Sequence, residues 1–176
     1  MQYITSYQSP LGKILLASDY QGLTGLWFEN DKYYADGLGS QNISMETTIL
    51  KQTKQWLDEY FSQRQPSFIL PLHLIGTDFQ KMIWQILLTI PYGQVMTYRE
   101  IADIAAARLH KEHMSAQAVG GAVGRNHIEI IVPCHRVVGS NGSLTGYAAG
   151  LSIKKKLLQL EKIDVSKFKI PKGSEN

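Results

Sequence analysis

The chain contains a single cysteine, Cys134, and the residues around it favour nucleophilic chemistry. Pro133 precedes the cysteine, and His135 and Arg136 follow it, so two groups able to carry positive charge lie beside the sulfur. Nearby positive charge stabilises a thiolate, which is the reactive form of cysteine. A lone cysteine is more often a small buried apolar residue. These neighbours are the reason to prefer a nucleophile.

Adjacent side chains diverge on both strands and helices, so we do not expect His135 to touch the Cys134 sulfur. A bridging water is the coupling that we expect between them. The imidazole then needs a carboxylate to orient it and to stabilise its cationic form. Glu161, at the end of the last amphipathic segment, offers one, although sequence spacing does not show that the two side chains meet.

The N-terminal part of the chain predicts a small antiparallel sheet. Residues 1–7, 12–18 and 23–29 are short runs of aliphatic, aromatic and β-branched side chains, separated by turn-forming sequences. Such runs favour three strands in a meander. The polar, glycine-containing residues 31–42 predict a loop.

A helix is predicted to follow this sheet, over residues 45–63, because the apolar residues recur with helical spacing. Its predicted buried face comprises Ile49, Thr53, Trp56 and Tyr60. Two prolines and an extended segment then mark a domain boundary. We therefore predict an N-terminal domain over residues 1–72, a C-terminal domain over 73–165 and a flexible tail over 166–176.

The C-terminal domain is predicted to be mostly helical. Thr77 or Asp78 begins one helix, and Thr97 begins the next, with Glu100 completing a capping box. Ser115 begins a third helix, rich in small residues. Two short helices joined by a polar turn are typical of a helix-turn-helix. The apolar residues 128–132 predict a strand that ends at Pro133, and the lysines 154–156 predict a solvated face of the last helix.

The composition limits the class of protein. The chain has 176 residues, a formal net charge of +3 and one cysteine, which excludes an internal disulfide and a multi-cysteine metal site. No apolar run approaches the roughly 20 residues that cross a bilayer, and the N-terminus lacks a signal-peptide pattern. We therefore expect a soluble cytoplasmic protein with no membrane association.

Four motifs, in order and at their usual spacing, resemble the O6-alkylguanine-DNA alkyltransferases, also called methylated-DNA–protein-cysteine methyltransferases. They are FQKMIWQILLTIPYGQVMTYREIA, AVGGAVGRN, IVPCHRVVGSNGSLTGYAAG and KKKLLQLE, and they span about residues 77 to 162. A cysteine–histidine pair alone would be weak evidence, whereas this series of motifs is very specific. The resemblance implies an α/β (α+β) chain with a ribonuclease H-like N-terminal sheet and helix and a winged helix-turn-helix-like C-terminal domain.

The resemblance also implies roles for single residues. The Cys134 thiolate attacks the alkyl carbon on guanine O6, His135 takes the thiol proton through a water, and Glu161 orients His135. Tyr98 donates to guanine N3, and Asn126 links the recognition helix to the active-site loop. The implied substrate-binding positions are Val137, Tyr147, Ala148 and Ala149. The implied DNA-binding positions are Gln117, Ala118, Gly121, Ala122, Arg125 and Arg136.

The implied partner is double-stranded DNA that contains O6-alkylguanine, bound from the minor groove by a monomer that flips the base. O4-alkylthymine is a second candidate substrate. The thioether product is stable to water, so the protein is expected to act once and without a cofactor. Some relatives need zinc in the N-terminal domain. This chain has no cysteine there, and His73 alone is no site, so we expect no metal.

Three positions depart from the family pattern. Gln117 stands where an arginine usually fills the space of the flipped base, and it cannot supply that charge. His127 replaces a proline after Asn126, with an expected effect on loop stiffness. Ala149 replaces a frequent glycine, which predicts a narrower pocket for bulky alkyl groups.

Three other functions compete with alkyl transfer. A non-catalytic damage binder on the same fold would lack the cysteine, so Cys134 argues against it. A cysteine–histidine hydrolase would not explain the helix-turn-helix. A sequence-specific regulator would need side chains that read base edges, and residues 115–124 carry almost none.

Overall fold

The computed structural model describes residues 1–170, and these residues form two compact units. The first unit comprises Met1–Ile75 and a short return segment, His127–Glu129. The second comprises Gly76–Asn126 and the chain from Ile130 onward. The contacts thus divide the chain after residue 75, close to the predicted boundary after residue 72, but the assignment of residues 127–129 to the first unit was not predicted from the sequence.

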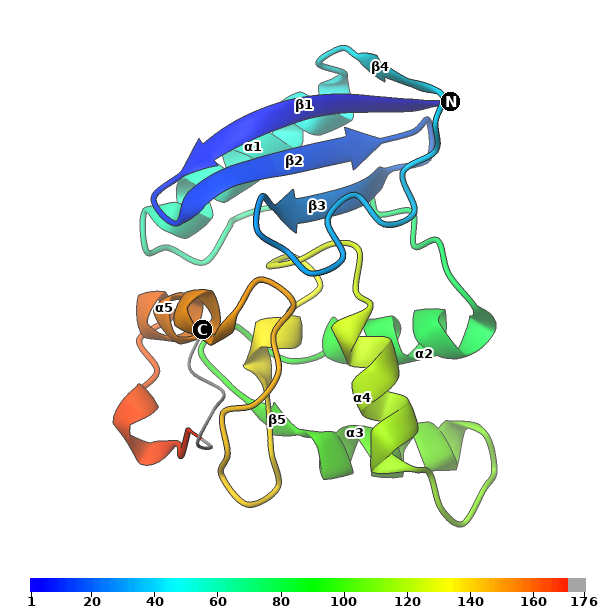
Figure 1. Ribbon diagram of the computed structural model, residues 1–176, viewed down its shortest axis with the longest axis vertical. Coiled ribbons are helices and arrows are strands. Elements are labelled where there is room, and N and C mark those ends of the chain that lie inside the picture. The colour runs from blue at the N-terminus through cyan, green and yellow to red at the C-terminus, as the bar shows by residue number, and fades with distance from the viewer. Residues whose placement is uncertain (171–176) are drawn as a thin grey trace. The chain divides into compact units, whose positions relative to one another are not determined.

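The first unit is built on the predicted meander. β1 (Gln2–Ser9), β2 (Gly12–Ser18) and β3 (Leu23–Phe28) pair antiparallel in chain order. A short fourth strand, β4 (Asn42–Ser44), adds parallel to β1, so the sheet order is β3-β2-β1-β4 (Figure 1). β4 was not predicted, because three residues on a sheet edge leave no alternating pattern in the sequence.

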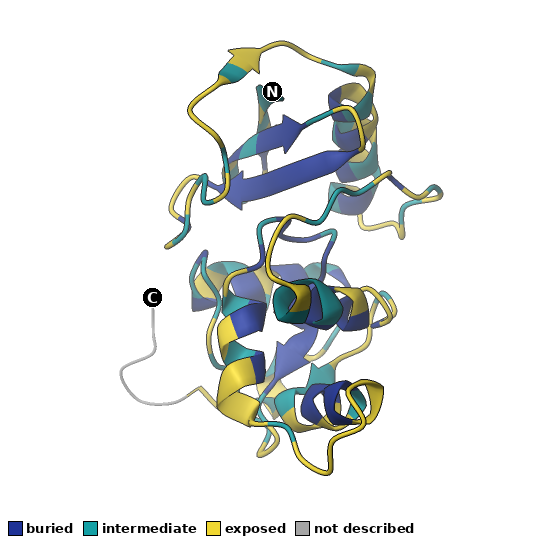
Figure 2. Cartoon of the chain, turned by 90° about the vertical axis from the view of Figure 1, so that its right-hand side faces the viewer, coloured by how far each residue is buried: buried dark blue, intermediate teal, exposed yellow. Residues whose placement is uncertain are grey.

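Helix α1 (Thr48–Phe61) runs along one face of this sheet (Figure 1). Thr47 begins it, because its hydroxyl accepts from the Leu50 amide. The buried face of α1 is Leu50, Thr53, Leu57 and Tyr60. Ile49 and Trp56 are only half-buried, so the predicted face was rotated by about one residue. The central strand β2 and the edge strand β3 are mostly buried and appear in dark blue (Figure 2).

The second unit contains the predicted helix-turn-helix. Helices α2 (Asp78–Leu87), α3 (Tyr98–Arg108) and α4 (Ala116–Gly124) pack on one another. Thr77 and Thr97 both form complete capping boxes, and Ser115 caps α4, which confirms the three predicted helix starts. Two short strands, β5 (Met96–Thr97) and β6 (Val137–Val138), pair in parallel and join the start of α3 to the region of Cys134.

Helix α5 (Leu151–Leu160) and the 3-10 turn η2 (Val165–Lys167) complete the second unit. Their apolar residues form one cluster with the segment after β6. It comprises Val138, Leu144, Leu151 and Leu158, against which Ile163, Val165 and Phe168 pack. The Leu144 amide also donates to the Lys169 carbonyl over 2.7 Å. The predicted tail is therefore packed over residues 166–170, while residues 171–176 lie outside the described part of the chain.

The α+β fold class predicted from the sequence is confirmed, with a sheet and helix in the first unit and a mainly helical second unit. Within residues 1–170, no helix is both long and apolar enough to span a bilayer.

The return segment lies against β3 in the first unit. The Leu26 amide donates to the His127 carbonyl over 2.8 Å, and the Glu129 amide donates to the Leu26 carbonyl over 3.0 Å. His127 also pairs with Asp36 at 3.3 Å. The chain between α4 and Cys134 therefore passes through the first unit at residues 127–129.

Candidate active site

Cys134 begins a single 3-10 turn, η1 (Cys134–Arg136), and residues 129–133, directly before it, are not a strand. The strand predicted over residues 128–132 is wrong, because Ile128 makes only an isolated bridge to Leu26, residues 129–131 form a turn, and Ile130 has a positive φ of 68°. Pro133, with φ −83° and ψ 64°, has the conformation of an inverse γ-turn, and the Cys134 amide donates back to the Val132 carbonyl over 2.8 Å. The cysteine is therefore presented by a tight turn.

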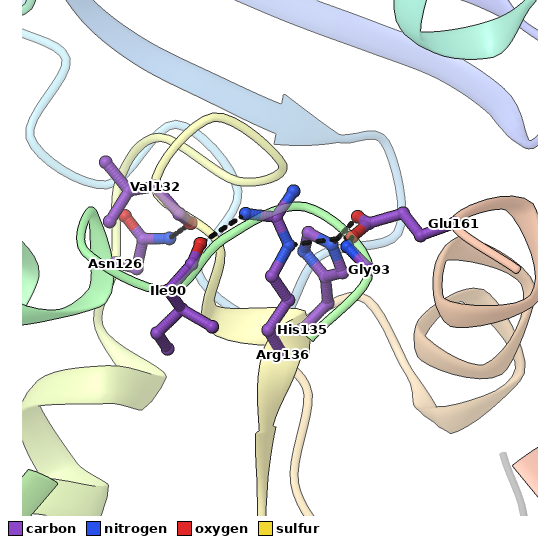
Figure 3. A network of polar contacts seen from close by, with 7 residues as sticks. All are labelled: Ile90, Gly93, Asn126, Val132, His135, Arg136 and Glu161. Atoms are coloured by element: carbon purple, nitrogen blue, oxygen red, sulfur yellow. Dashed lines mark hydrogen bonds and ion pairs between the residues drawn. The ribbon is translucent and has the colours of Figure 1, made fainter. Parts of the chain in front are cut away.

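Asn126, one residue after the last turn of α4, holds this turn from behind. Its side-chain nitrogen Nδ2 donates to the Val132 carbonyl over 2.8 Å and to the Cys134 sulfur over 3.2 Å (Figure 3 shows the first of these bonds). Only 4% of Asn126 is exposed, so this amide is fixed inside the unit. A donor to sulfur favours the thiolate over the thiol. A direct hydrogen bond thus joins the residue that follows the end of α4 to the turn that carries Cys134.

His135 and Glu161 meet in the interior of the second unit. The imidazole Nε2 and the carboxylate Oε2 are 2.5 Å apart, and both side chains are fully buried (Figure 3). Glu161 caps the end of α5, where its amide donates to the Leu157 carbonyl. The fold therefore brings together the two residues whose meeting the sequence spacing left open.

Glu161 is held as an anion. Burial alone would raise its pKa, but hydrogen bonds from His135 and Arg136 and the positive charge of Arg136 lower that pKa to about 2. An ionised carboxylate only accepts hydrogen bonds, so Nε2 of His135 must carry the proton. In neutral His135, Nδ1 is then the basic atom, and it has no hydrogen-bond partner within residues 1–170.

His135 itself is kept neutral. Its burial lowers the pKa of the imidazole, and the charges of Arg136 and Lys154 act in the same direction, while Glu161 acts against them. A neutral imidazole can accept a proton and an imidazolium cannot. The site therefore holds a histidine in its basic form, oriented by an anion, one residue from the thiol.

Lys154 is a buried residue near Cys134 whose position was not predicted from the sequence. Instead of lying on a solvated face, its side chain is fully buried. Its ammonium donates to the carbonyls of Val137, Thr145 and Gly146 over 2.6, 3.0 and 3.2 Å. Lys154 lies three residues after Leu151 and three before Leu157, which are both buried. This helical spacing was the sequence pattern that could have predicted its burial.

Tyr98, the first residue of α3, faces the same loop. Its hydroxyl donates to the Thr145 carbonyl over 3.5 Å, and a Cβ added at Gly146 would lie 3.7 Å from that hydroxyl. Burial, with a smaller contribution from Cys134, raises the pKa of Tyr98 to about 12. The phenol therefore keeps its proton at neutral pH and remains a donor.

Of the residues expected to contact substrate, Val137 begins β6 and the other three lie in the loop between β6 and α5. Tyr147 and Ala148 are half-buried, and Ala149 is buried at 8% exposure. The Val137 carbonyl accepts from Lys154 over 2.6 Å.

The expected DNA-binding residues divide into two groups. Gln117, Ala118 and Gly121 on α4, with Arg125 at its end, are exposed. Ala122 is 4% exposed, and its carbonyl accepts from Trp84 Nε1, so it is an internal packing residue. Arg136 is 8% exposed and is bonded inside the unit. The structure therefore does not place Ala122 and Arg136 on a DNA-binding surface. The sequence alone does not show whether a small residue such as Ala122, or a charged residue such as Arg136, faces inward or outward.

Within residues 1–170, no group of three or more histidine, cysteine, aspartate or glutamate side chains is placed to bind a metal ion. His73 instead contacts Asp19 in the first unit, where Nδ1 and Oδ2 are 2.5 Å apart.

Both units match known family models. Residues 2–74 match the ribonuclease-like domain of 6-O-methylguanine DNA methyltransferase, and residues 78–163 match the DNA-binding domain of the same family. A methylated-DNA–protein-cysteine methyltransferase of Methanosarcina barkeri is 41% identical over 174 residues, which cover 90% of this chain and 96% of the relative. The Haemophilus influenzae protein of that name is 39% identical over 175 residues, covering 99% and 92%.

Solved structures of similar proteins agree with this result. The O6-methylguanine methyltransferase of Mycobacterium tuberculosis superposes with a TM-score of 0.77 at 39% identity, covering 92% of this chain and 93% of that one. A second structure from that organism, described as OGT in complex with DNA, gives a TM-score of 0.78 at 37% identity, covering 94% of each chain.

Proposed function

This chain belongs to the 6-O-methylguanine DNA methyltransferase family, and we propose that it repairs double-stranded DNA by taking the alkyl group of O6-alkylguanine onto Cys134. The observation that carries the proposal is the arrangement around the thiol. Asn126 donates to the sulfur, and the adjacent His135 is a neutral base held by an ionised Glu161. This arrangement suits the removal of the thiol proton by His135 when substrate is bound.

The reaction is a direct displacement at carbon. The thiol proton passes through a water to Nδ1 of His135, and the thiolate attacks the alkyl carbon on O6. The S–C bond forms as the C–O6 bond breaks, and the electron pair of that bond stays with the guanine. A proton donated to the guanine anion restores neutral guanine. In the net reaction, the thiol proton replaces the alkyl group on the base.

Tyr98 is the donor that we propose for the departing guanine, at ring nitrogen N3. The raised pKa of its phenol supports this role, because the proton is retained until the base becomes anionic. We propose that the carbonyls of Cys134 and Val137 accept from the exocyclic amine, while Tyr147, Ala148 and Ala149 border the base.

The protein is consumed by the reaction. The product is a thioether, which water does not cleave, and the chain has no second cysteine to resolve it. No cofactor enters the scheme. One chain therefore repairs one lesion, and the reaction is stoichiometric.

Helix α4 is the element that we propose for the minor groove. Gln117, Ala118, Gly121 and Arg125 are exposed, and an added Cβ at Gly121 or Gly124 would meet nothing within 4 Å. Packing inside the protein therefore does not require these glycines. Small residues on an open helix face suit a close approach to a DNA backbone, and Arg125 suits a phosphate contact. Gln117 is proposed as a neutral wedge that fills the space of the flipped base.

We further propose that the protein acts as a monomer in the cytoplasm and that O4-alkylthymine is a second substrate. These three statements rest on the sequence and on the family.

The test is a titration under excess substrate. A duplex with a single O6-methylguanine is incubated in tenfold excess over protein, and restored guanine is counted with time. Single use predicts a plateau at one repaired base per chain. A steady rate beyond one equivalent would contradict the proposal, and so would an absence of repair.

A further inference from the structure

Arg136 stands beside the nucleophile in the sequence, yet its side chain turns away from any exposed surface. The guanidinium Nε donates to Glu161 Oε1 over 2.8 Å, and one terminal nitrogen donates to the Ile90 carbonyl over 2.8 Å (Figure 3). Its central carbon lies 5.8 Å from the ring centre of Tyr92, which is a cation–π distance. One side chain thus joins the active-site turn η1, the loop after α2 and the end of α5.

These contacts divide the two oxygens of Glu161 between different partners. Oε1 accepts from Arg136 Nε and from the Gly93 amide, the latter over 3.0 Å, while Oε2 faces His135 (Figure 3). A carboxylate fixed through Oε1 cannot rotate away from the imidazole. The planar guanidinium fork is suited to this task, because two of its donors are held at a set angle.

The charges in this buried cluster also balance. Glu161 carries one negative charge and Arg136 one positive charge, so the pair is neutral beside His135. The other charged group that acts on the imidazole is Lys154 on α5, and Tyr92 lies against Glu161 and Arg136. Without Arg136, the carboxylate would favour a proton on the imidazole.

We propose that Arg136 is a positioning residue for alkyl transfer, which fixes Glu161 and keeps the His135–Glu161 pair from binding an extra proton at neutral pH. The inference rests on the proposed function, because it concerns the base of that reaction. Arg136 does not touch substrate in this account. Its effect reaches the thiol only through the protonation and orientation of His135. Burial is the main cause that lowers the pKa of His135, and the charge of Arg136 acts in the same direction.

The test compares Arg136→Gln, Arg136→Lys and Arg125→Gln in single-turnover methyl transfer from pH 5.5 to 9. In Arg136→Gln, we expect the acid limb of the rate to move upward by about one pH unit, which approaches a tenfold loss of rate at pH values below the pKa of His135 and leaves the rate within about twofold at pH 9. Arg136→Lys keeps the charge and loses the fork, so its acid limb should stay within about 0.3 unit while the rate falls at every pH.

Arg125→Gln is the matched control, because Arg125 is exposed at the end of α4. It should weaken DNA binding and leave the acid limb in place. If Arg136→Gln weakens DNA binding as much as Arg125→Gln and leaves the acid limb unmoved, Arg136 is a DNA contact and the inference is overturned. If Arg136→Gln does not fold, a shifted acid limb in Arg136→Lys would overturn it instead.

A second measurement separates this inference from the repair reaction. The ring nitrogen shifts of His135 are followed by NMR during a pH titration of the DNA-free protein. We expect the imidazole to remain protonated to a pH about one unit higher in Arg136→Gln than in the unsubstituted protein. This result would support the role of Arg136 even if no methyl transfer were found. An unchanged titration of His135 would overturn it whatever the repair assay gives.

Discussion

Replacing Lys154 by methionine tests how a buried charge is tolerated beside the nucleophile. Burial lowers the pKa of Lys154 from 10.5 to about 8, although Cys134 acts in the opposite direction. Since one pKa unit corresponds to about 1.4 kcal/mol, the buried ammonium costs the folded state about 3 kcal/mol at neutral pH. Methionine removes this cost. It also leaves the Val137 carbonyl without its buried donor, which costs about 1–3 kcal/mol.

The two effects nearly cancel at pH 7, so Lys154→Met is expected to lie within about 2 kcal/mol of the unsubstituted protein there. The pH dependence separates them. Between pH 8 and 10.5 the unfolded chain binds a proton at Lys154 that the folded chain has lost, so the free energy of unfolding of the unsubstituted protein rises with pH. The variant lacks this rise.

Urea unfolding at pH 7 and pH 10 measures the difference. The stability of the unsubstituted protein relative to Lys154→Met should grow by about 2–3 kcal/mol between the two pH values. Lys155→Met, a half-buried neighbour in the same run, is the matched control and should show no such growth. Parallel stability curves for Lys154→Met and the unsubstituted protein would refute the reasoning. Methyl transfer should slow in Lys154→Met, because Thr145 and Gly146 lose their common donor.

Three further changes test other parts of the structure. Burial, and then the neighbouring Asp31 carboxyl, raise the pKa of Glu129 well above 4.5, so the stability of the folded chain should fall as pH rises from about 4.5. Glu129→Gln should remove this fall and raise the free energy of unfolding by about 1–3 kcal/mol at pH 8. Equal urea midpoints at pH 5 and 8 for the unsubstituted protein would contradict this expectation. Asn126→Ala should lower the free energy of unfolding by about 1–3 kcal/mol and slow the reaction of Cys134 with iodoacetamide at pH 7, because the sulfur and the Val132 carbonyl lose their donor. An unchanged rate would show that this donor does not activate the thiol. Ala149→Gly should speed benzyl transfer more than methyl transfer, since Ala149 is buried in the loop that borders the proposed base site; equal changes for the two groups in a competition assay would exclude a steric role.

The sequence predicted those helices and strands that depend on residues close together in the chain. Thr77, Thr97 and Ser115 begin their helices because each hydroxyl accepts from an amide three residues later, and that spacing is visible in the sequence. The first three strands were equally visible. Apolar content alone misled at residues 128–132, where residues 129–131 form a turn and the Val132 carbonyl accepts from the Asn126 side chain and the Cys134 amide.

The inward or outward direction of a polar side chain was the part that the sequence could not supply. Arg136 and Lys154 look like surface charges, and their partners are backbone carbonyls and one carboxylate that only the folded chain brings near. The meeting of His135 and Glu161 was named as a hypothesis, because 26 residues separate them and no local rule joins them. Hydrogen bonds to carbonyl oxygens have no sequence signature, since every residue has a carbonyl.

The most direct test of the central claim is the intact mass of the protein after incubation with a duplex that contains O6-methylguanine, beside Cys134→Ser. The account predicts a gain of one methyl group per chain, located on the peptide that carries Cys134 and absent from the variant. A methyl group on another residue, or an unchanged mass after the base has been restored, would contradict it.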